Sequence, residues 1–166
     1  MLFRSAIQLT ARNRIARLDS SGGPDLGFDP GVGVDGAVNS IALQTDGRII
    51  IGGAFRSVRG IPRYGVARFN TDGTLDLTFD PGAGTTVGAG GPLGAVRAVM
   101  IQPNGAILIG GDFTHVNNTP RGGIARLTAG GAIDGSFDPG TGANGGVYAI
   151  GLQSGGQILI GGAFTS

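Results

Sequence analysis

The chain has 166 residues, enough for one domain, and its net charge of +1 provides none of the clustered basic surface that nucleic-acid binders show. Glycine occurs 35 times, roughly three times its usual share of about 7%. With no cysteine and no apolar run long enough to span a bilayer, we expect no disulfide, no thiolate chemistry, and neither nucleic acid nor a membrane as a partner. Every acidic residue is Asp and every basic residue is Arg, so the good helix formers Glu and Lys are absent and an all-β fold is expected.

In chain order, the first complete unit is predicted to hold four strands. An Asp-Gly turn at 46–47 joins the first two into a hairpin, because Asp-Gly between apolar runs is a strong hairpin signal. A polar loop over 56–63 leads to the third strand, and Pro81 ends the unit because proline cannot continue a central ladder. The four predicted strands are residues 38–44, 48–55, 65–70 and 74–79.

The same pattern returns in a second complete unit and in a third that is split between the two ends of the chain. The second unit is predicted to hold strands at 96–102, 106–113, 123–127 and 132–137. The split unit takes its third and fourth strands from 14–19 and 26–28, and its first and second from 147–153 and 157–164.

One stretch is common to all three units. Residues 107–113 read ILIGGDF, and close copies stand at 49–55 and 158–164. Three consecutive branched aliphatics are typical of a strand buried on both faces. The glycine pair lets the backbone bulge or approach another chain closely, and the aromatic residue closes the strand. We expect a structural role for these residues, which are Gly52, Gly53, Phe55, Gly110, Gly111, Phe113, Gly161, Gly162 and Phe164.

A closing Phe-Asp-Pro marks each unit boundary. Phe28 and Phe79 are 51 residues apart, whereas Phe79 and Phe137 are 58 apart, and extra glycine-rich residues over 85–94 account for the longer interval. Residues 3–5 match residues 55–57, so the chain is predicted to begin and end at the same phase, between the second and third strands of a unit. We therefore expect one half-domain over 1–166, with complete repeats at about 31–81 and 82–139 and a split repeat from 1–30 plus 140–166.

Four short antiparallel strands in a unit of about 50 residues are typical of a β-propeller blade. A β-helix is the other architecture considered, but its rungs are much shorter. Three blades do not readily close a ring, since propellers have four to eight. We expect either two chains that associate head to tail into about six blades, each completing a blade of the other, or a longer chain that supplies neighbouring blades.

The amino-acid sequence of the repeat, IALQTDGRIIIGGAF followed by GVARFNTDGTLDLTFDP, resembles the delta-60 repeat, a bacterial β-propeller family. The resemblance covers nearly the whole chain in three copies. It implies propeller architecture and a place in large secreted or cell-surface proteins, and it implies no defined chemistry. Kelch repeats are the nearest rival, but they expect a later Tyr and Trp in each blade, and this chain has no Trp.

Arginine and aspartate also recur once per unit, as Arg17, Arg68 and Arg126 with Asp29, Asp80 and Asp138. They form either a ring of ligand-binding charges or, as we favour, scaffolding in which each Arg binds an Asp or a backbone carbonyl of its blade. The Asp of each Asp-Pro-Gly is expected to accept backbone N–H bonds in a turn.

No cofactor, metal or catalytic residue is expected. Asp46 and Asp72 suggest calcium, but they are isolated, whereas calcium needs six to eight converging oxygens. His115 is the only histidine, and we expect it in a solvated loop. Structural residues recur in every repeat, whereas the residues of a binding site need not. We therefore expect ligand contacts first at positions that differ between the units, which are His115, Asn117, Tyr148 and residues 85–94.

These observations favour a non-enzymatic structural or interaction module, which assembles with itself and presents loops or a central channel to a protein or glycan. The alternative is a propeller hydrolase or lyase with its site at the channel mouth. That alternative needs converging His, carboxylates or an activated nucleophile, and one His with scattered Asp does not supply them.

Overall fold

The computed structural model describes residues 12–166, so the predicted match between residues 3–5 and 55–57 lies outside the described part of the chain. All regular structure within residues 12–166 is β-strand, as predicted. Residues 12–166 contain no helical segment that could span a bilayer.

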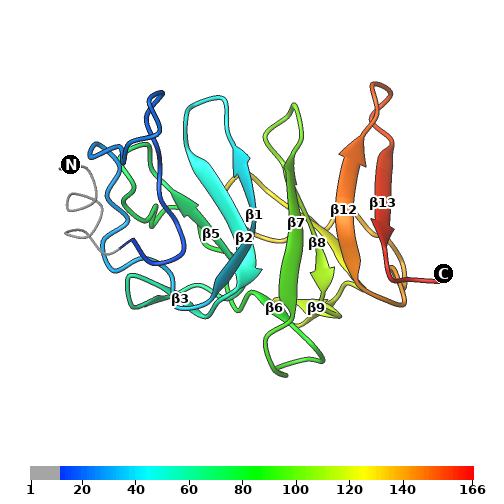
Figure 1. Cartoon of the computed structure of the whole chain (residues 1–166). Coiled ribbons are helices and arrows are strands. Elements are labelled where there is room, and N and C mark those ends of the chain that lie inside the picture. The colour runs from blue at the N-terminus through cyan, green and yellow to red at the C-terminus, as the bar shows by residue number, and fades with distance from the viewer. Residues whose placement is uncertain (1–11) are drawn as a thin grey trace.

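Three antiparallel sheets carry the fold, one for each unit (Figure 1). The sheet of unit 1 has the order β1 (Ala37–Leu43), β2 (Ile49–Ala54), β5 (Val66–Phe69). The sheet of unit 2 has the order β7 (Ala95–Ile101), β8 (Ile107–Asp112), β11 (Ile124–Leu127). In the described part of the chain, unit 3 has only β12 (Val147–Leu152) and β13 (Ile158–Gly162). Residues 12–30 are called the N-terminal segment below.

The predicted fourth strand of each unit is wrong. It is reduced to a single bridge, Phe69 with Leu75 in unit 1 and Leu127 with Ile133 in unit 2. The cause in unit 1 is Asp76, whose carboxylate accepts the backbone N–H of Thr78 at 2.8 Å and so turns the chain away from the ladder. The strands predicted at 14–19 and 26–28 are also absent, and the N-terminal segment keeps only the equivalent bridge, Leu18 with Pro24.

The polar loop predicted over 56–63 is instead a small hairpin of β3 (Ser57–Val58) and β4 (Ile61–Pro62). Unit 2 repeats it as β9 (His115–Val116) and β10 (Thr119–Pro120), and β6 (Thr85–Thr86) pairs with the other side of β9. Both hairpins turn through two residues with positive φ, which are Arg59 and Gly60, then Asn117 and Asn118. Two such residues are the signature of a type I′ turn, whose twist suits a two-residue hairpin.

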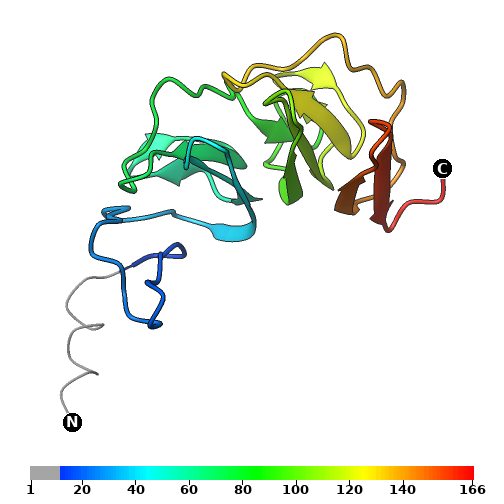
Figure 2. The ribbon, with the colours of Figure 1, turned by 90° about the horizontal axis from the view of Figure 1, so that it is seen from above.

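The sheets follow one another along an arc, with the N-terminal segment at one end and β13 at the other (Figure 2). Strands β1, β7 and β12 lie on the inner side of the arc, while β5 and β11 lie on its outer side (Figure 2). The chain therefore passes from inner to outer strand within a unit and returns to the inner strand of the next.

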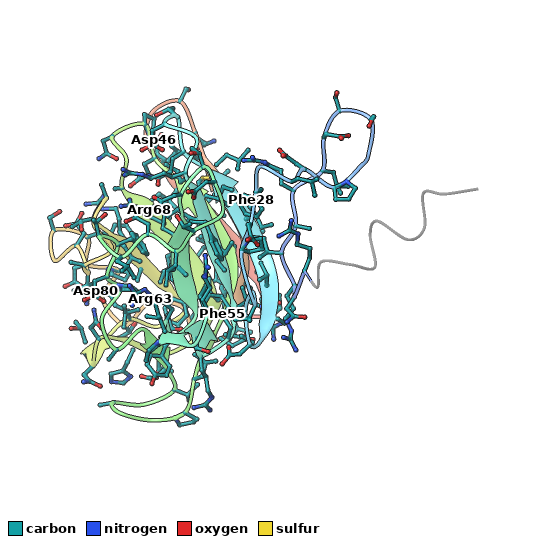
Figure 3. All side chains as sticks on the ribbon, turned by 90° about the vertical axis from the view of Figure 1, so that its left-hand side faces the viewer. Phe28, Asp46, Phe55, Arg63, Arg68 and Asp80 are labelled. Carbon is teal, nitrogen blue, oxygen red and sulfur yellow. The ribbon has the colours of Figure 1, made fainter. Side chains whose placement is uncertain are left out.

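The hydrophobic core lies between consecutive units. Ile49 and Ile51 face the N-terminal segment in one buried cluster, which includes Phe28 and Phe55 (Figure 3). Ile50 points the other way, into a second cluster shared with unit 2. A strand with a core on both faces has no polar alternation, which explains the uninterrupted aliphatic run.

The seven residues by which the second interval exceeds the first all lie between Thr85 and Gly94. In unit 1 the corresponding stretch is only Val34 to Gly36, and Val34 forms with Val58 the bridge that β6 forms with β9. The additional residues form a loop closed by the hydrogen bond from Val87 N–H to the Pro92 carbonyl, 2.8 Å long. This loop projects below β6 in Figure 1.

Candidate functional site

Each inner strand contains a β-bulge at the same place. Pairing between β1 and β2 shifts between Val38 and Ser40, which leaves Asn39 as the extra residue. The shift recurs around Arg97 in β7 and around Tyr148 in β12. Bulges often redirect a side chain beside a binding site. Here one backbone frame displays three different side chains, all exposed, on the strands that line the inner side of the arc.

The glycine pair opposite each bulge has two separate tasks. The second glycine faces the bulged strand: a Cβ on Gly53 would overlap the carbonyl oxygen of Ala37. The first glycine faces the following unit: a Cβ on Gly52 would lie 2.6 Å from Val96 Cγ1, and one on Gly110 would lie 2.8 Å from Val147 Cγ1. The pair therefore permits both the bulge and the close packing of unit on unit.

Arg97 and Tyr148 belong to a cluster that crosses from unit 2 to unit 3. Arg97 contacts Asp112 Oδ2 through Nε and Nη2, each at 2.7 Å. A Cβ on Gly146 would touch both the Asp112 carboxylate and the Tyr148 ring, so the three side chains lie next to one another. Ala54 and Ala163 occupy the position of Asp112 in the other units, so this ion pair is not part of the repeated scaffold.

A cavity of about 440 Å³ opens beside this cluster, between units 2 and 3. Asp112 and Gly146 line it together with Phe113, Arg121 and Asn144. The cluster thus offers a carboxylate, a guanidinium and an exposed phenol ring at the rim of a recess. Sequence reasoning named Tyr148 but missed Arg97 and Asp112. The available signal was that charged residues stand at both positions in one unit alone.

The recurrent arginines bind an aspartate, but not the one that follows the closing Phe. Arg68 Nε donates to Asp76 Oδ2 at 2.8 Å, and Arg17 and Arg126 make the same bond to Asp25 and Asp134. Each guanidinium also lies over the closing phenylalanine of its unit, with Arg68 4.9 Å from the centroid of the Phe79 ring. These arginines therefore hold the end of their own unit in place.

The Arg68–Asp76 pair is almost entirely buried, with each side chain 5% exposed. Burial alone would raise the pKa of Asp76. The hydroxyl and N–H of Thr78, together with Arg68, outweigh it and hold the pKa of that carboxyl below its usual range. In unit 2 the hydroxyl and N–H of Ser136, then Arg126, lower the pKa of Asp134. Both aspartates are thus ionised scaffolding at neutral pH.

Asp29, Asp80 and Asp138 lie in turns. Each accepts the backbone N–H of the glycine two residues later, at 3.0 Å in Asp29, 2.8 Å in Asp80 and 3.0 Å in Asp138. Asp46 and Asp72 likewise accept backbone N–H groups two residues on. Within residues 12–166 no three potential metal ligands of the His, Cys, Asp or Glu type gather in one place.

The structure does not bring the three predicted ligand contacts together. His115 is half-buried in β9 rather than in a loop, and its Nδ1 lies 2.9 Å from Thr114 Oγ1. Asn117 forms the type I′ turn that follows, and its N–H donates to the Gly84 carbonyl at 2.9 Å. Tyr148 lies in a different sheet, on β12. Of the three, only Tyr148 reaches the cluster at the rim of the cavity.

Residues 44–79 and 102–137 each match one family model, described as a domain of unknown function (DUF5122) beta-propeller. Both segments match a β-propeller repeat family. The comparison with curated proteins found no match, and neither did the comparison with solved structures.

The two matched β-propeller segments occupy equivalent parts of units 1 and 2. Each runs from the hairpin turn after the inner strand to the closing phenylalanine, Phe79 or Phe137. Strands β1 and β7, with their bulge residues Asn39 and Arg97, lie just before the matched segments.

Unit 3, which lies outside the matched segments, has an open outer edge. Strand β13 pairs with β12 on one side, and within residues 12–166 no strand pairs with its other side. Leu159 in β13 is 56% exposed, whereas its equivalents Ile50 and Leu108 are fully buried.

Proposed function

We propose that this chain is a non-enzymatic β-propeller module of the delta-60 repeat type, which assembles with itself and binds a glycan on the inner face of the propeller. The observation that carries the proposal is the repeated bulge. Its backbone geometry is the same in the three units, but the exposed side chain that it displays differs in each. The sequence of the repeat and the two segments that match a β-propeller model support assignment to this repeat type.

The chemistry of the Tyr148 cluster supports a saccharide as the ligand. An exposed tyrosine ring offers a flat apolar face to the C–H groups of a sugar ring and a hydroxyl at its end. The Arg97–Asp112 pair places donors and an acceptor for sugar hydroxyls beside that ring, next to the recess of about 440 Å³. Because the Asp112 carboxylate balances the Arg97 charge, the cluster favours a neutral sugar over an anionic ligand.

The use of charged residues elsewhere supports a scaffold rather than a catalyst. Arg17, Arg68 and Arg126 repeat one bond to an aspartate, and that repetition is what a structural role requires. Self-assembly is supported by the open edge of β13, which exposes apolar residues that the other units bury.

The ligand is tested on an array of neutral and acidic oligosaccharides, followed by titration calorimetry of any sugar bound. We expect Tyr148→Ala and Asp112→Ala to lose binding. Leu77→Ala, which removes an exposed side chain of unit 1 (64%, against 51% for Tyr148), should keep it. Equal binding by all three variants would overturn the assigned site. Capture of a protein with no sugar bound would overturn the glycan as ligand.

Self-assembly is tested by the mass of the chain in solution, measured by light scattering after size-exclusion chromatography. A mass of two copies is expected. A stable, folded single copy would overturn self-assembly.

A further inference from the structure

We propose that residues 15–18 of a second copy add to the open edge of β13 as its missing outer strand and thereby complete unit 3. This inference rests on the proposed self-assembly and specifies the segment and the register. The antiparallel pairs are Leu18 with Ile158, Arg17 with Leu159, Ala16 with Ile160, and Ile15 with Gly161.

The register is taken from the two complete sheets. In unit 2, β11 reads Ile-Ala-Arg-Leu and pairs with β8 so that Leu127 lies opposite Ile107 and Ile124 lies opposite Gly110. Unit 1 repeats this register between β5 and β2. Residues 15–18 are a third copy of the β11 sequence, and within residues 12–166 they pair with no strand. Within residues 12–166, the chain thus has both an outer-strand sequence, residues 15–18, that pairs with no strand and a strand edge, that of β13, that has no outer strand.

The exposure of the two surfaces is complementary. Leu18 is 63% exposed, although its equivalents Phe69 and Leu127 are fully buried. Ala16 is exposed too, whereas Ala67 and Ala125 are fully buried. The β13 side shows the same contrast at Leu159. Pairing the two surfaces would give each residue the environment that its repeats already have.

The end of unit 2 provides an independent indication, because the end of every earlier unit binds the outer strand of the next. Phe28 packs against Phe69 of unit 1, with ring centroids 6.2 Å apart, and is buried. Phe79 is buried in the cluster that includes Leu127 of unit 2. Phe137 is only half-buried, and the residue that would cover it by this rule is Leu18 of the second copy.

Two recurring hydrogen bonds follow the same rule. Arg17 Nη1 donates to the Thr71 carbonyl at 2.6 Å, and Arg68 Nη1 donates to the Ala129 carbonyl at 2.7 Å. Within residues 12–166 Arg126 has no carbonyl acceptor of this kind. The equivalent position is Ser20 of the second copy, three residues after its Arg17.

The backbone shows the same pattern one residue further along. The N–H of Asp29 donates to the Asp72 carbonyl at 2.7 Å, and that of Asp80 donates to the Gly130 carbonyl at 2.9 Å. In the described part of the chain the N–H of Asp138 makes no bond of this type. Its equivalent acceptor is Ser21 of the second copy. The segment that fits unit 3 therefore extends from residue 15 to residue 21.

The inner strands complete the fit. A Cβ on Gly161 would meet only Ala149, at 3.9 Å, whereas Gly52 and Gly110 are tightly covered by the following unit. Ile41, the equivalent of Val99 that covers Gly52, is 54% exposed. Strand β1 of the second copy would cover Gly161 with this residue. Two such junctions, related by a two-fold axis, close the arc of Figure 2 into a ring.

A disulfide test reads the register directly, because the chain has no cysteine of its own. Full-length A16C and I160C are purified separately, mixed under reducing conditions and then oxidised. Directly opposite residues in antiparallel strands have Cα atoms about 4.5–5.5 Å apart, within the range that a disulfide spans. We expect a covalent two-copy species on a non-reducing gel, with the 16–160 linkage identified by mass spectrometry of the peptides.

The matched control is A16C mixed with L159C. A shift of one residue turns a strand side chain to the opposite face, so this mixture should remain uncrosslinked. Equal crosslinking in both mixtures would overturn the register. A light-scattering mass of two copies without crosslinking in the A16C and I160C mixture would overturn the strand assignment and leave self-assembly intact. A folded single copy without crosslinking would overturn both.

Discussion

Arg68 and Asp76 form a buried ion pair 2.8 Å long, and the same pair recurs in two less buried settings. The side chains of Arg126 and Asp134 are 20% and 21% exposed, and those of Arg17 and Asp25 are about a third exposed. The chain thus offers one interaction at three depths. The most buried pair, that of Arg68, is the one with a three-stranded sheet both in its own unit and in the following unit.

We predict that Asp76→Ala lowers the free energy of unfolding by about 3–5 kcal/mol, because it leaves the Arg68 charge buried without its partner. Asp25→Ala is the matched control and should cost far less, since solvent screens Arg17. Urea unfolding followed by circular dichroism measures both. Equal losses in the two variants would contradict a role for burial.

Stability is predicted to fall in acid and to change little between pH 5 and pH 8. The pKa values of Asp76, Asp134 and Asp25 all lie below their usual range in the folded chain. A lowered folded-state pKa contributes stability that is fully present above the unfolded value, about 3.9, and is lost as pH falls through the lower folded values. Thermal unfolding recorded from pH 8 to pH 2 checks this. A midpoint that rises on acidification would show the sign to be wrong.

Gly161→Ala should leave the fold of one copy unchanged yet weaken association. The added Cβ meets only Ala149 within the chain, but it would press against Ile41 of a second copy. Overpacking costs about 1–3 kcal/mol, or roughly five- to 150-fold in the dissociation constant for each junction. Sedimentation across a concentration series measures this constant.

The control for that variant is Gly135→Ala, because a Cβ on Gly135 has open space around it. It should associate like the parent chain. Unaltered association of the Gly161 variant would place the contact elsewhere.

Replacing residues 86–93 with a single Asp should preserve the fold. The change restores the length of unit 1, where Asp35 follows Val34 and accepts the backbone N–H groups of Arg56 and Ser57 at 2.8 and 2.9 Å. The entropy cost of closing a loop grows only slowly with its length. We therefore expect a midpoint of thermal unfolding within a few degrees of that of the parent chain. Loss of the cooperative transition would mean that the loop belongs to the scaffold.

The sequence predicted the strands that a repeated aliphatic run defines, such as β2 and β8, to within about one residue. Prediction from the sequence failed where a side chain accepts a backbone N–H that would otherwise pair within the sheet. In the sequence, Asp76 stands inside an alternating segment that predicts a strand. Only the hydrogen bond from Thr78 N–H to its carboxylate shows why pairing ends after Leu75. The hairpin of β3 and β4 was missed because its two-residue turn begins with Arg59, which rarely adopts a positive φ.

The candidate site was predictable only in part. Tyr148 stood out because no other unit has an aromatic residue there, but the bulge that displays it depends on pairing between β12 and β13. The pairing of Arg97 with Asp112 joins residues 15 apart in sequence across a hairpin, and the repeat alignment alone gives no distance between them. Likewise, the partner of Arg68 is eight residues away at Asp76 rather than at Asp80, because the chain turns back before the closing phenylalanine.

Ile15 and Phe28 are already buried against unit 1, so the segment that carries residues 15–18 is held in place before any second copy arrives. Little ordering remains to be done on encounter, and the two ends of the arc are fixed relative to each other. Once one junction has formed, the other is intramolecular, with a high effective concentration. A ring made this way should open at one junction and reclose many times before its copies separate, so that subunit exchange is slow even where each single junction is weak.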